Sequence, residues 1–549
     1  MAEVLERREQ MFPSLSAVQL ARLARFGRRR SVPAGEIVFE QGEASPEFFV
    51  VLSGALEVVQ PADGVEVPIT VHRTGGFTGE VNMLSGRRAL VRGRMIEAGE
   101  LLVISPEALR RIVQSDAELS ELFMRAFILR RVALISHAMG DTVLIGSSHS
   151  AGTLRLREFL VRNAQPHAYL DVDHDQGVQA LLDRFGLRVS DVPVLICRYD
   201  RVLKNPSNEA VADCLGFNPG LDTSKVHDLV VVGAGPAGLA AAVYAASEGL
   251  DVLVLETNAP GGQAGSSSKI ENYLGFPTGI SGQALAGRAY TQAQKFGAAI
   301  AVARTAVRLR CERRLNTVEL SVGGSVAGRS LVIASGVQYR KLPLPDLARF
   351  EGVGVYYGAT PMEAQLCAGE EIIIVGGGNS AGQAAVFLAS KARQVQILVR
   401  GPGLAETMSR YLIQRIEESP NITVRPFSQI TALEGTERLE RVQVSDTRAG
   451  RTETLPIGHV FLMTGASPNT EWLKGCLALD DKGFVKTGPD LSRDELTAWP
   501  LSRTPHLLET SIPSVFAVGD VRSGSVKRVA SAVGEGSICV QLVHRVLAE

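Results

Sequence analysis

The sequence has few aromatic side chains and no two cysteines at CxxC spacing. Aromatic residues make up only 5% of the 549 residues, and the six cysteines are scattered along the chain. Scattered single cysteines argue against a disulfide framework and against a zinc site, so we expect no bound metal. We interpret most of the cysteines as buried thiols, with Cys197 and Cys214 among the expected core residues.

Strong net charge and unbroken apolar runs are also missing. The formal net charge is −1, so the composition indicates no basic surface for nucleic acid. The N-terminus is charged and lacks the apolar core of a signal peptide. The longest apolar run, 229–246, is interrupted by three glycines and a proline. We therefore expect a cytoplasmic protein that neither spans a membrane nor binds nucleic acid.

Glycine, in contrast, is abundant, with 55 residues. Many glycines beside few aromatic residues indicate tight turns between strands and helices, which nucleotide-binding folds favour. A chain of this length is also too long for one hydrophobic core and predicts three or four domains.

The first glycine-rich turn follows the predicted strand 229–232 and precedes an alanine-rich helix that ends near Glu248. The acid at the end of the next strand, about twenty residues further on, completes the dinucleotide-binding pattern. In this pattern the glycines let the backbone approach the pyrophosphate, and the acid accepts hydrogen bonds from the ribose hydroxyls. The candidate residues are Gly233, Gly235, Pro236, Ala237, Gly238 and Glu256.

A second turn of the same kind follows the predicted strand 372–375. The next strand ends in Arg400 instead of an acid, which favours NADPH over NADH because a guanidinium pairs with the 2′-phosphate. Arg410 is either an assisting residue or a solvated helix residue. The candidate residues of this second turn are Gly376, Gly378, Asn379, Ser380, Ala381 and Arg400.

Residues 226–549 resemble the low-molecular-weight thioredoxin reductase family. The motifs that carry the resemblance are Gly-Gly-Gln at 261–263, Glu-Asn-Tyr at 271–273, Val-Gly-Asp at 518–520 and Arg-Val-Ala at 528–530. The resemblance implies FAD and NAD(P)H as cofactors, a homodimer, and an NAD(P)H-binding domain inserted into the FAD-binding domain. It also implies further candidate FAD-binding residues beside those of the first turn. They are Gly262, Gln263, Asn272, Gly519, Asp520, Arg528, Val529 and Ala530.

The redox dithiol of that family is missing from its usual place before the second turn. Gly358 and Pro361 stand at the positions of the two cysteines, and neither carries a nucleophile. Cys367 is the candidate catalytic thiol, although a buried helix cysteine is the favoured interpretation. The sequence does not identify the electron acceptor, and the candidates are a small redox protein and a disulfide. A ferredoxin reductase of the same fold also lacks the cysteines, but it ranks lower because its C-terminal extension is missing here.

Residues 141–222 resemble a thioredoxin or glutaredoxin domain without its cysteines. A predicted strand at 142–145 leads into Ser147-Ser-His-Ser150, where those folds carry their redox motif, and Val192-Pro193 stands where they have a cis-proline. Because the start of the helix has no thiol to activate, we expect docking or adaptor use rather than catalysis.

Residues 1–140 resemble the cyclic-nucleotide-binding domain of the catabolite activator and protein kinase A families. The segment 77–89 carries the resemblance. A predicted helix and short strands precede it, and a second helical stretch follows it. The resemblance implies that the Gly-Glu pair binds the ribose and that an arginine binds the cyclic phosphate. Nucleotide binding and a fold kept only for docking both remain open. The residues concerned are Gly79, Glu80 and Arg88, with Arg87 as the alternative arginine.

The predicted fold is multidomain. A β-barrel with helices at 1–140 and a degenerate thioredoxin-like α/β domain at 141–222 precede two Rossmann-like, three-layer α/β lobes. These lobes are an FAD-binding domain at 225–350 and 463–549 and an NAD(P)H-binding domain at 351–462. The predicted function is an FAD-dependent NAD(P)H oxidoreductase that passes hydride from NADPH through FAD to an unidentified acceptor, with a cyclic nucleotide as candidate effector. The alternative is a non-catalytic redox or cyclic-nucleotide sensor flavoprotein.

Overall fold

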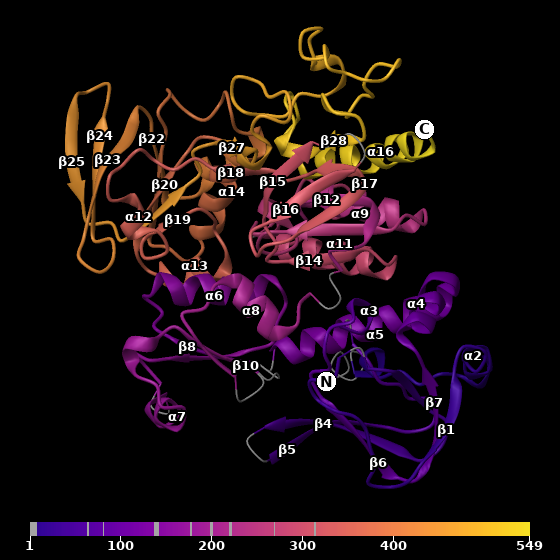
Figure 1. Cartoon of the computed structure of the whole chain (residues 1–549). Coiled ribbons are helices and arrows are strands. Elements are labelled where there is room, and N and C mark those ends of the chain that lie inside the picture. The colour runs from indigo at the N-terminus through magenta and orange to yellow at the C-terminus, as the bar shows by residue number, and fades with distance from the viewer. Residues whose placement is uncertain are drawn as a thin grey trace.

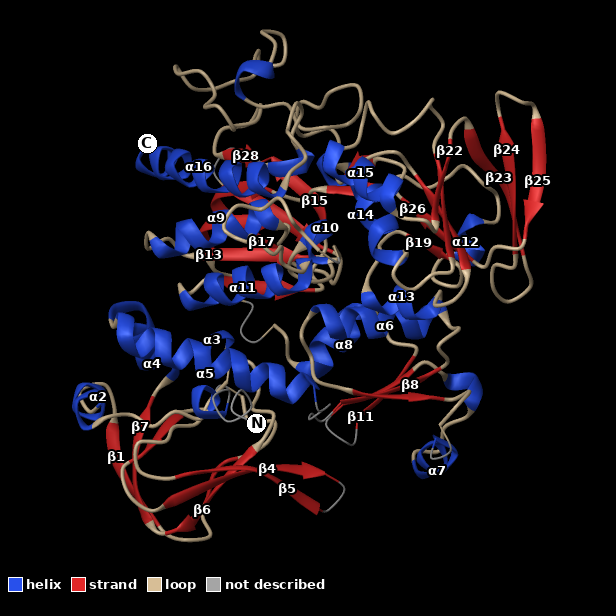
Figure 2. Cartoon of the chain, turned by 180° about the vertical axis from the view of Figure 1, so that it is seen from behind, coloured by secondary structure: helices blue, strands red, loops and turns tan. Residues whose placement is uncertain are grey.

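The computed structural model describes residues 8–549 except 45, 63–64, 81, 137–141, 176–177, 198–200, 219–221, 268 and 312–314. Figures 1 and 2 show a barrel and a smaller sheet side by side, with two larger α/β lobes above them. Within this described part of the chain, no helix is long and apolar enough to cross a membrane.

The N-terminal unit consists of two antiparallel sheets and the helices that follow them. The strand orders are β1-β7-β3 and β2-β6-β4-β5. The predicted helical stretch forms two helices, because the backbone of Asp116 is extended between them. The elements are α2 (Ala17–Leu23), β1 (Arg28–Val32), β2 (Ile37–Phe39), β3 (Phe48–Val51), β4 (Ala55–Ala62), β5 (Val65–His72), α3 (Asn82–Ser85), β6 (Arg92–Glu97), β7 (Gly99–Ile104), α4 (Pro106–Ser115) and α5 (Ala117–Ser136).

The middle unit is a four-stranded sheet in the order β11-β10-β8-β9. Strand β9 runs parallel to β8, and β10 runs antiparallel to both β8 and β11. The Val192–Pro193 peptide bond is cis, as the sequence predicts. Helices α6 and α8 lie on the side of this sheet that faces the two lobes (Figures 1 and 2). The elements are β8 (Thr142–Gly146), α6 (Ala151–Arg162), β9 (Ala168–Asp171), α7 (Val178–Arg184), β10 (Val194–Cys197), β11 (Arg201–Lys204) and α8 (Asn208–Leu215).

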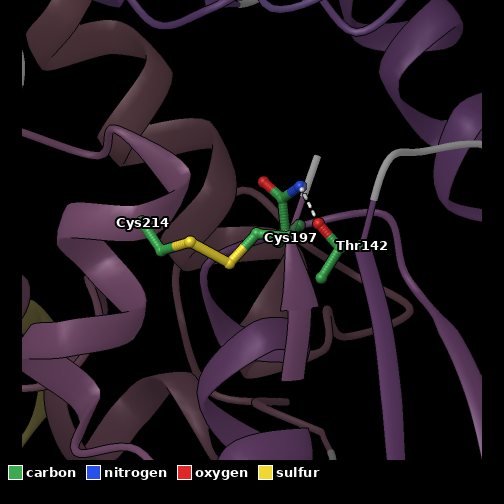
Figure 3. The surroundings of a disulfide bond; sticks show 4 residues. Thr142, Cys197 and Cys214 are labelled. Carbon is green, nitrogen blue, oxygen red and sulfur yellow. Dashed lines mark hydrogen bonds between the residues drawn. A yellow bond between two sulfur atoms is a disulfide. The ribbon is translucent and has the colours of Figure 1, made fainter. Parts of the chain in front are cut away.

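The prediction of free thiols at Cys197 and Cys214 is wrong. The two residues form a disulfide between the end of β10 and α8 (Figure 3). Both are fully buried, as predicted for core residues. Their separation of 17 residues matches no motif, and the two sulfurs meet only because α8 folds back onto the sheet. Cys367 and Cys539 are free and buried.

The first lobe is built on a mostly parallel sheet in the order β14-β13-β12-β17-β16-β15, with β28 paired to β17. Its alanine-rich helix α9 packs against α16 near the end of the chain, and the side chains of both helices enter one buried cluster. The elements are β12 (Val226–Val232), α9 (Pro236–Ser247), β13 (Val252–Glu256), α10 (Gly262–Gly265), α11 (Gly282–Lys295), β14 (Ala299–Val302), β15 (Ala306–Cys311), β16 (Asn316–Leu320), β17 (Ser325–Ile333), β28 (Val515–Ala517) and α16 (Val529–Ala548).

The second lobe has a parallel sheet in the order β19-β26-β20-β21-β22 and a separate antiparallel sheet of β23, β24 and β25. The elements are α12 (Leu347–Phe350), β19 (Val355–Tyr356), α13 (Pro361–Leu366), β20 (Glu371–Val375), α14 (Asn379–Leu388), β21 (Gln394–Leu398), α15 (Arg410–Glu418), β22 (Ile422–Arg425), β23 (Ser428–Glu434), β24 (Arg441–Asp446), β25 (Arg451–Leu455) and β26 (His459–Leu462).

Two short strands join the lobes. The chain leaves the first lobe through β18 (Val337–Tyr339) and returns through β27 (Ala466–Pro468), and the two strands pair antiparallel. The second lobe also approaches the middle unit: a Cβ added to Gly352 would lie 3.3 Å from Cβ of Ala151, the first residue of α6.

We predict that the Cys197–Cys214 disulfide stabilises the middle unit. Closing a loop of this length reduces the entropy of the unfolded chain, so the variant Cys197→Ala/Cys214→Ala should lose about 3 kcal/mol of unfolding free energy. Denaturant unfolding followed by circular dichroism would measure the loss. Cys476 is disulfide-bonded as well, so a reductant acts on both proteins, but it should destabilise the native protein more than the double variant. Equal stability of the two proteins without reductant would contradict the prediction.

Candidate cofactor and nucleotide sites

The first glycine turn joins β12 to α9 in a conformation that requires glycine. Gly233 has a φ of +106°, and a Cβ on Gly238 would lie 1.9 Å from the Gly233 carbonyl oxygen. Helix α9 begins after Gly235 with no side-chain cap, whereas serine side chains cap α4, α6, α8 and α11. The first backbone N–H groups of α9 are therefore available to an anion, as a pyrophosphate requires.

Glu256 lies at this turn, as the sequence predicts. Its carboxylate accepts hydrogen bonds from the backbone N–H groups of Ala234 (2.8 Å) and Asn258 (2.9 Å). Burial raises the pKa of Glu256, while these hydrogen bonds and the charge of Arg162 act in the opposite direction. The acid is thus fixed beside the glycine turn, where a ribose hydroxyl would reach it.

Two of the other predicted FAD residues, Gly262 and Gly519, lie against this turn and the start of α9. A Cβ on Gly262 would lie 2.9 Å from Cα of Gly235, and one on Gly519 would lie 2.8 Å from Cβ of Ala237, so only glycine leaves room there. Gln263 donates a hydrogen bond to the carbonyl oxygen of Val337 (3.3 Å). These close backbone approaches and the uncapped helix fit an extended dinucleotide.

The remaining predicted FAD residues are exposed or partly exposed. Asn272 and Arg528 are exposed. Arg528 precedes α16, and Val529 and Ala530 form its first turn. Asp520 is half-buried, and burial raises the pKa of its carboxyl group.

The second turn repeats the arrangement between β20 and α14. Gly376 has a φ of +140°, and α14 begins after Gly378 with no side-chain cap. The side chain of Asn379 accepts a hydrogen bond from the backbone N–H of Ser409 (2.7 Å). Ser380 is exposed, Ala381 is buried, and Arg400 is exposed just after β21. The second lobe therefore has its own anion-binding helix end, with a cation close to the end of the neighbouring strand.

The positions that lack the redox dithiol lie between the lobes. A Cβ on Gly358 would lie 3.8 Å from Cβ of Ser266 in the first lobe. The next residues form a local cap, in which Thr360 donates from its backbone N–H and its hydroxyl to Glu363. Cys367 is fully buried in the core of the second lobe, and burial raises its pKa to about 11. This placement argues against a nucleophilic role for Cys367.

The predicted motif of the middle unit contains hydroxyl groups and no thiol. Ser147 donates a hydrogen bond to Asp173 (2.5 Å), and Ser150 caps α6 by accepting from the backbone N–H of Thr153. The serines at the start of α6 therefore act as ordinary helix-capping and turn residues.

A cavity of about 460 Å³ lies in the N-terminal unit, between β4, β5, the segment 77–91 and α5. Gly79, Glu80 and Arg88 line it, so the structure brings the predicted cyclic-nucleotide residues together. Glu80 already forms a buried ion pair with Arg131 of α5 (3.4 Å). Burial lowers the pKa of His72, which also lines the cavity, to about 3.

Arg87 also lines this cavity. Its side chain contacts the middle unit and the first lobe, and the sequence does not indicate these contacts. Its guanidinium donates a hydrogen bond to the hydroxyl of Tyr290 on α11 (2.8 Å) and lies 4.2 Å from the ring centroid of Phe217. The neighbouring Arg88 lies against the end of α8, since a Cβ on Gly216 would be 3.0 Å from its Nε. Residues far apart in the chain make these contacts, and no local motif marks them.

Comparison with known proteins agrees with this geometry. The pattern of the pyridine nucleotide-disulphide oxidoreductase family matches residues 227–536, and that of the cyclic nucleotide-binding domain matches 29–116. Thioredoxin reductase of Mycolicibacterium smegmatis is 32% identical over 60% of this chain and 99% of its own length. Thioredoxin reductase of Streptomyces clavuligerus is 31% identical over 59% of this chain and 95% of its own length. The crystal structure of Lactococcus lactis thioredoxin reductase superposes with a TM-score of 0.53 at 26% identity, covering 59% of this chain and 99% of its own.

The chain belongs to the pyridine nucleotide-disulphide oxidoreductase family, with a thioredoxin-reductase-like C-terminal region and an N-terminal cyclic nucleotide-binding domain. It is a flavin-dependent oxidoreductase, and membership of the family implies FAD and a pyridine nucleotide as cofactors.

We predict that Cys367 reacts slowly with alkylating agents. Because the pKa of its thiol is about 11, the nucleophilic thiolate is rare at pH 8 and increases about ten-fold with each pH unit up to that value. Mass spectrometry after iodoacetamide treatment of the folded protein would measure the rate against pH. Cys367→Ala should keep the rate of turnover with a disulfide acceptor. Rapid labelling at pH 8 together with loss of turnover in the variant would contradict the prediction.

Proposed function

We propose that this protein is an FAD-dependent NADPH oxidoreductase of the thioredoxin reductase type that passes electrons to an acceptor other than an internal dithiol. The observation that carries the proposal is the pair of uncapped helices, α9 and α14, each of which begins at a glycine turn after a parallel strand. When bound, FAD supplies hydride and electron transfer.

The residues of the chain bind and orient the two cofactors. The first turn of α9 would hold the FAD pyrophosphate, and Glu256 would accept the ribose hydroxyls. In the second lobe, α14 would hold the NADPH pyrophosphate, and Arg400 would pair with the 2′-phosphate, a dianion that a guanidinium recognises with two parallel hydrogen bonds.

The residues at the place of the missing dithiol limit which molecule can accept electrons from the flavin. Gly358 and Pro361 carry no nucleophile, and Cys367 is buried with a raised pKa, so a disulfide relay on this chain has no support. The matched relatives are named thioredoxin reductases. We therefore infer that a small redox protein or an external disulfide receives the electrons, and that the protein acts as a homodimer in the cytoplasm.

We infer that the middle unit is a thioredoxin-like domain without its active-site cysteines. Its strand order, the cis bond before Pro193 and the position of α6 after β8 support this inference. The proposed domains are 1–140 and 141–222, then 225–350 with 463–549 for FAD and 351–462 for NAD(P)H.

We further infer that a cyclic nucleotide occupies the cavity of the N-terminal unit and modulates turnover. Glu80 and Arg88 would bind its ribose and phosphate. Since Arg87 is adjacent to Arg88 and donates to Tyr290 of the first lobe, a shift of this segment on binding would alter the contact with the FAD-binding region.

We predict that NADPH reduces the flavin and that Arg400 selects NADPH. Anaerobic titration should bleach the flavin absorbance. Arg400→Met should raise the KM for NADPH about ten-fold and leave that for NADH unchanged, since only NADPH carries the 2′-phosphate. Arg393→Met, which removes an exposed arginine of the same lobe, is the matched control. A flavin that NADPH does not bleach would overturn the oxidoreductase proposal in favour of a non-catalytic sensor, which the missing dithiol also allows.

We predict that the Arg87–Tyr290 contact transmits the effect of the nucleotide. Arg88→Met should weaken binding of cAMP or cGMP at least about ten-fold by removing the phosphate partner. Tyr290→Phe should keep wild-type affinity and lose the nucleotide's effect on the rate of flavin reduction. Calorimetry and stopped-flow absorbance would measure the two quantities. A wild-type protein that binds neither nucleotide, or a Tyr290→Phe variant that retains the effect, would contradict the proposal.

A further inference from the structure

The end of α6 in the middle unit lies against the loop of the first lobe that follows Glu256. The Arg162 guanidinium donates through Nη2 to the carbonyl oxygen of Gly262 (3.0 Å). The side-chain amide of the next residue, Asn163, donates to the carbonyl oxygen of Asn258 (3.2 Å). Gly262 is the residue whose backbone approaches Gly235 at the phosphate turn, so Arg162 contacts the wall of the candidate FAD site.

The same loop is held from a second helix of the middle unit. The Asn208 side chain at the start of α8 donates to Oδ1 of Asn258 (3.0 Å), and Arg155 of α6 donates to Asn208 (2.6 Å). The backbone N–H of Asn258 in turn donates to the carboxylate of Glu256. The position of the predicted ribose acid therefore depends on hydrogen bonds that begin in the middle unit.

The two units also share one apolar core, which prevents them from moving independently. Val302 and Ala303, at the end of β14, belong to the same buried cluster as Phe159 and Phe217. Asn218 closes this contact by donating to the carbonyl oxygen of Val302 (2.8 Å) and accepting from its N–H (2.7 Å). Separating the units would expose these apolar surfaces to water.

Two polar atoms at the end of α6 are buried with no hydrogen-bond partner among the described residues. They are Nε of Arg162 and Oδ1 of Asn163. The Arg162 side chain is only 16% exposed, and Asn163 as a whole is 5% exposed. A buried donor and a buried acceptor left unpaired are costly, and a small shift of these side chains toward a polar ligand would pair them.

We propose that Arg162 and Asn163 complete the binding site for the ADP half of FAD, so that the middle unit is a fixed part of the cofactor site. The proposal rests on FAD binding by the first lobe, as inferred above. The Arg162 guanidinium lies beside the phosphate turn and also pairs through Nη1 with the half-exposed Glu158 of α6 (3.3 Å), so it provides positive charge that an anionic ligand would share with Glu158. The family pattern begins only at residue 227, and the M. smegmatis relative is matched over 99% of its length, so Arg162 lies outside the shared region.

The test measures FAD affinity of the full-length apoprotein, prepared by removing the flavin, through quenching of flavin fluorescence. Arg162→Met should raise the Kd for FAD about ten-fold, and Arg162→Lys should recover part of the loss because it retains the charge. Arg157→Met is the matched control: it removes a cation from the same helix, where Arg157 stacks on Tyr169 at 4.7 Å, away from the loop. The control should bind FAD as the wild type does.

A second measurement separates a cofactor contact from a purely structural role. The melting temperature of each apoprotein and its increase on adding FAD would be recorded. Arg162→Met should show a smaller FAD-induced increase than Arg157→Met while the two apoproteins melt together. Wild-type FAD affinity in Arg162→Met, or an equal loss in both variants, would overturn this inference. Failure of the wild-type protein to bind FAD would instead overturn the proposed function.

Discussion

The apolar contact between the middle unit and β14 determines how three of the four units are placed. Phe159 and Phe217 pack with Val302 and Ala303 in one buried cluster. Burying each large apolar side chain contributes about 1.5–3 kcal/mol, so this cluster resists separation of the units. Helix α8 is fixed as a result, and the N-terminal unit contacts its end through the Arg87–Phe217 pair. The N-terminal unit is thus placed by this contact with the middle unit together with its direct hydrogen bonds to the first lobe, from Arg87 to Tyr290 and from Gln114 to the carbonyl oxygen of Lys295 (3.1 Å).

Two buried arginines of α5 hold the segment 77–89 of the N-terminal unit, which contains the candidate nucleotide-binding residues. Arg130 donates to the carbonyl oxygens of Phe77 (3.1 Å) and Gly79 (2.8 Å), and Arg131 pairs with Glu80. Burial lowers the pKa of Arg130 to about 9. Charges with so little contact with water depend on the few groups that pair with them, and Nη2 of Arg130 has no partner among the described residues. Any ligand that engages Glu80 must therefore change the surroundings of Arg131, which ties occupancy of the cavity to the position of α5.

Sequence reasoning located the features that local chemistry determines. The glycine turns, the acid at Glu256 and the cis bond before Pro193 each depend on residues a few positions apart or on a fixed spacing. It missed the contacts that join distant parts of the chain. Arg87 and Tyr290 are 203 residues apart, and Cys197 meets Cys214 only after α8 folds back. Such pairs leave no periodic signal, because each residue by itself is compatible with a solvated or a core position.

The close approach of Gly352 to Ala151 has a mechanical consequence. Between the two lobes the chain runs through the paired strands β18 and β27, and rotation about their axis would break the Arg415–Glu271 ion pair (2.6 Å) that also joins the lobes. The start of α6 touches the second lobe, while its end is anchored to the first through Arg162. If the second lobe rotated, it would have to move past the first residues of α6. This helix would therefore limit the rotation. The middle unit would in this way act mechanically on the second lobe.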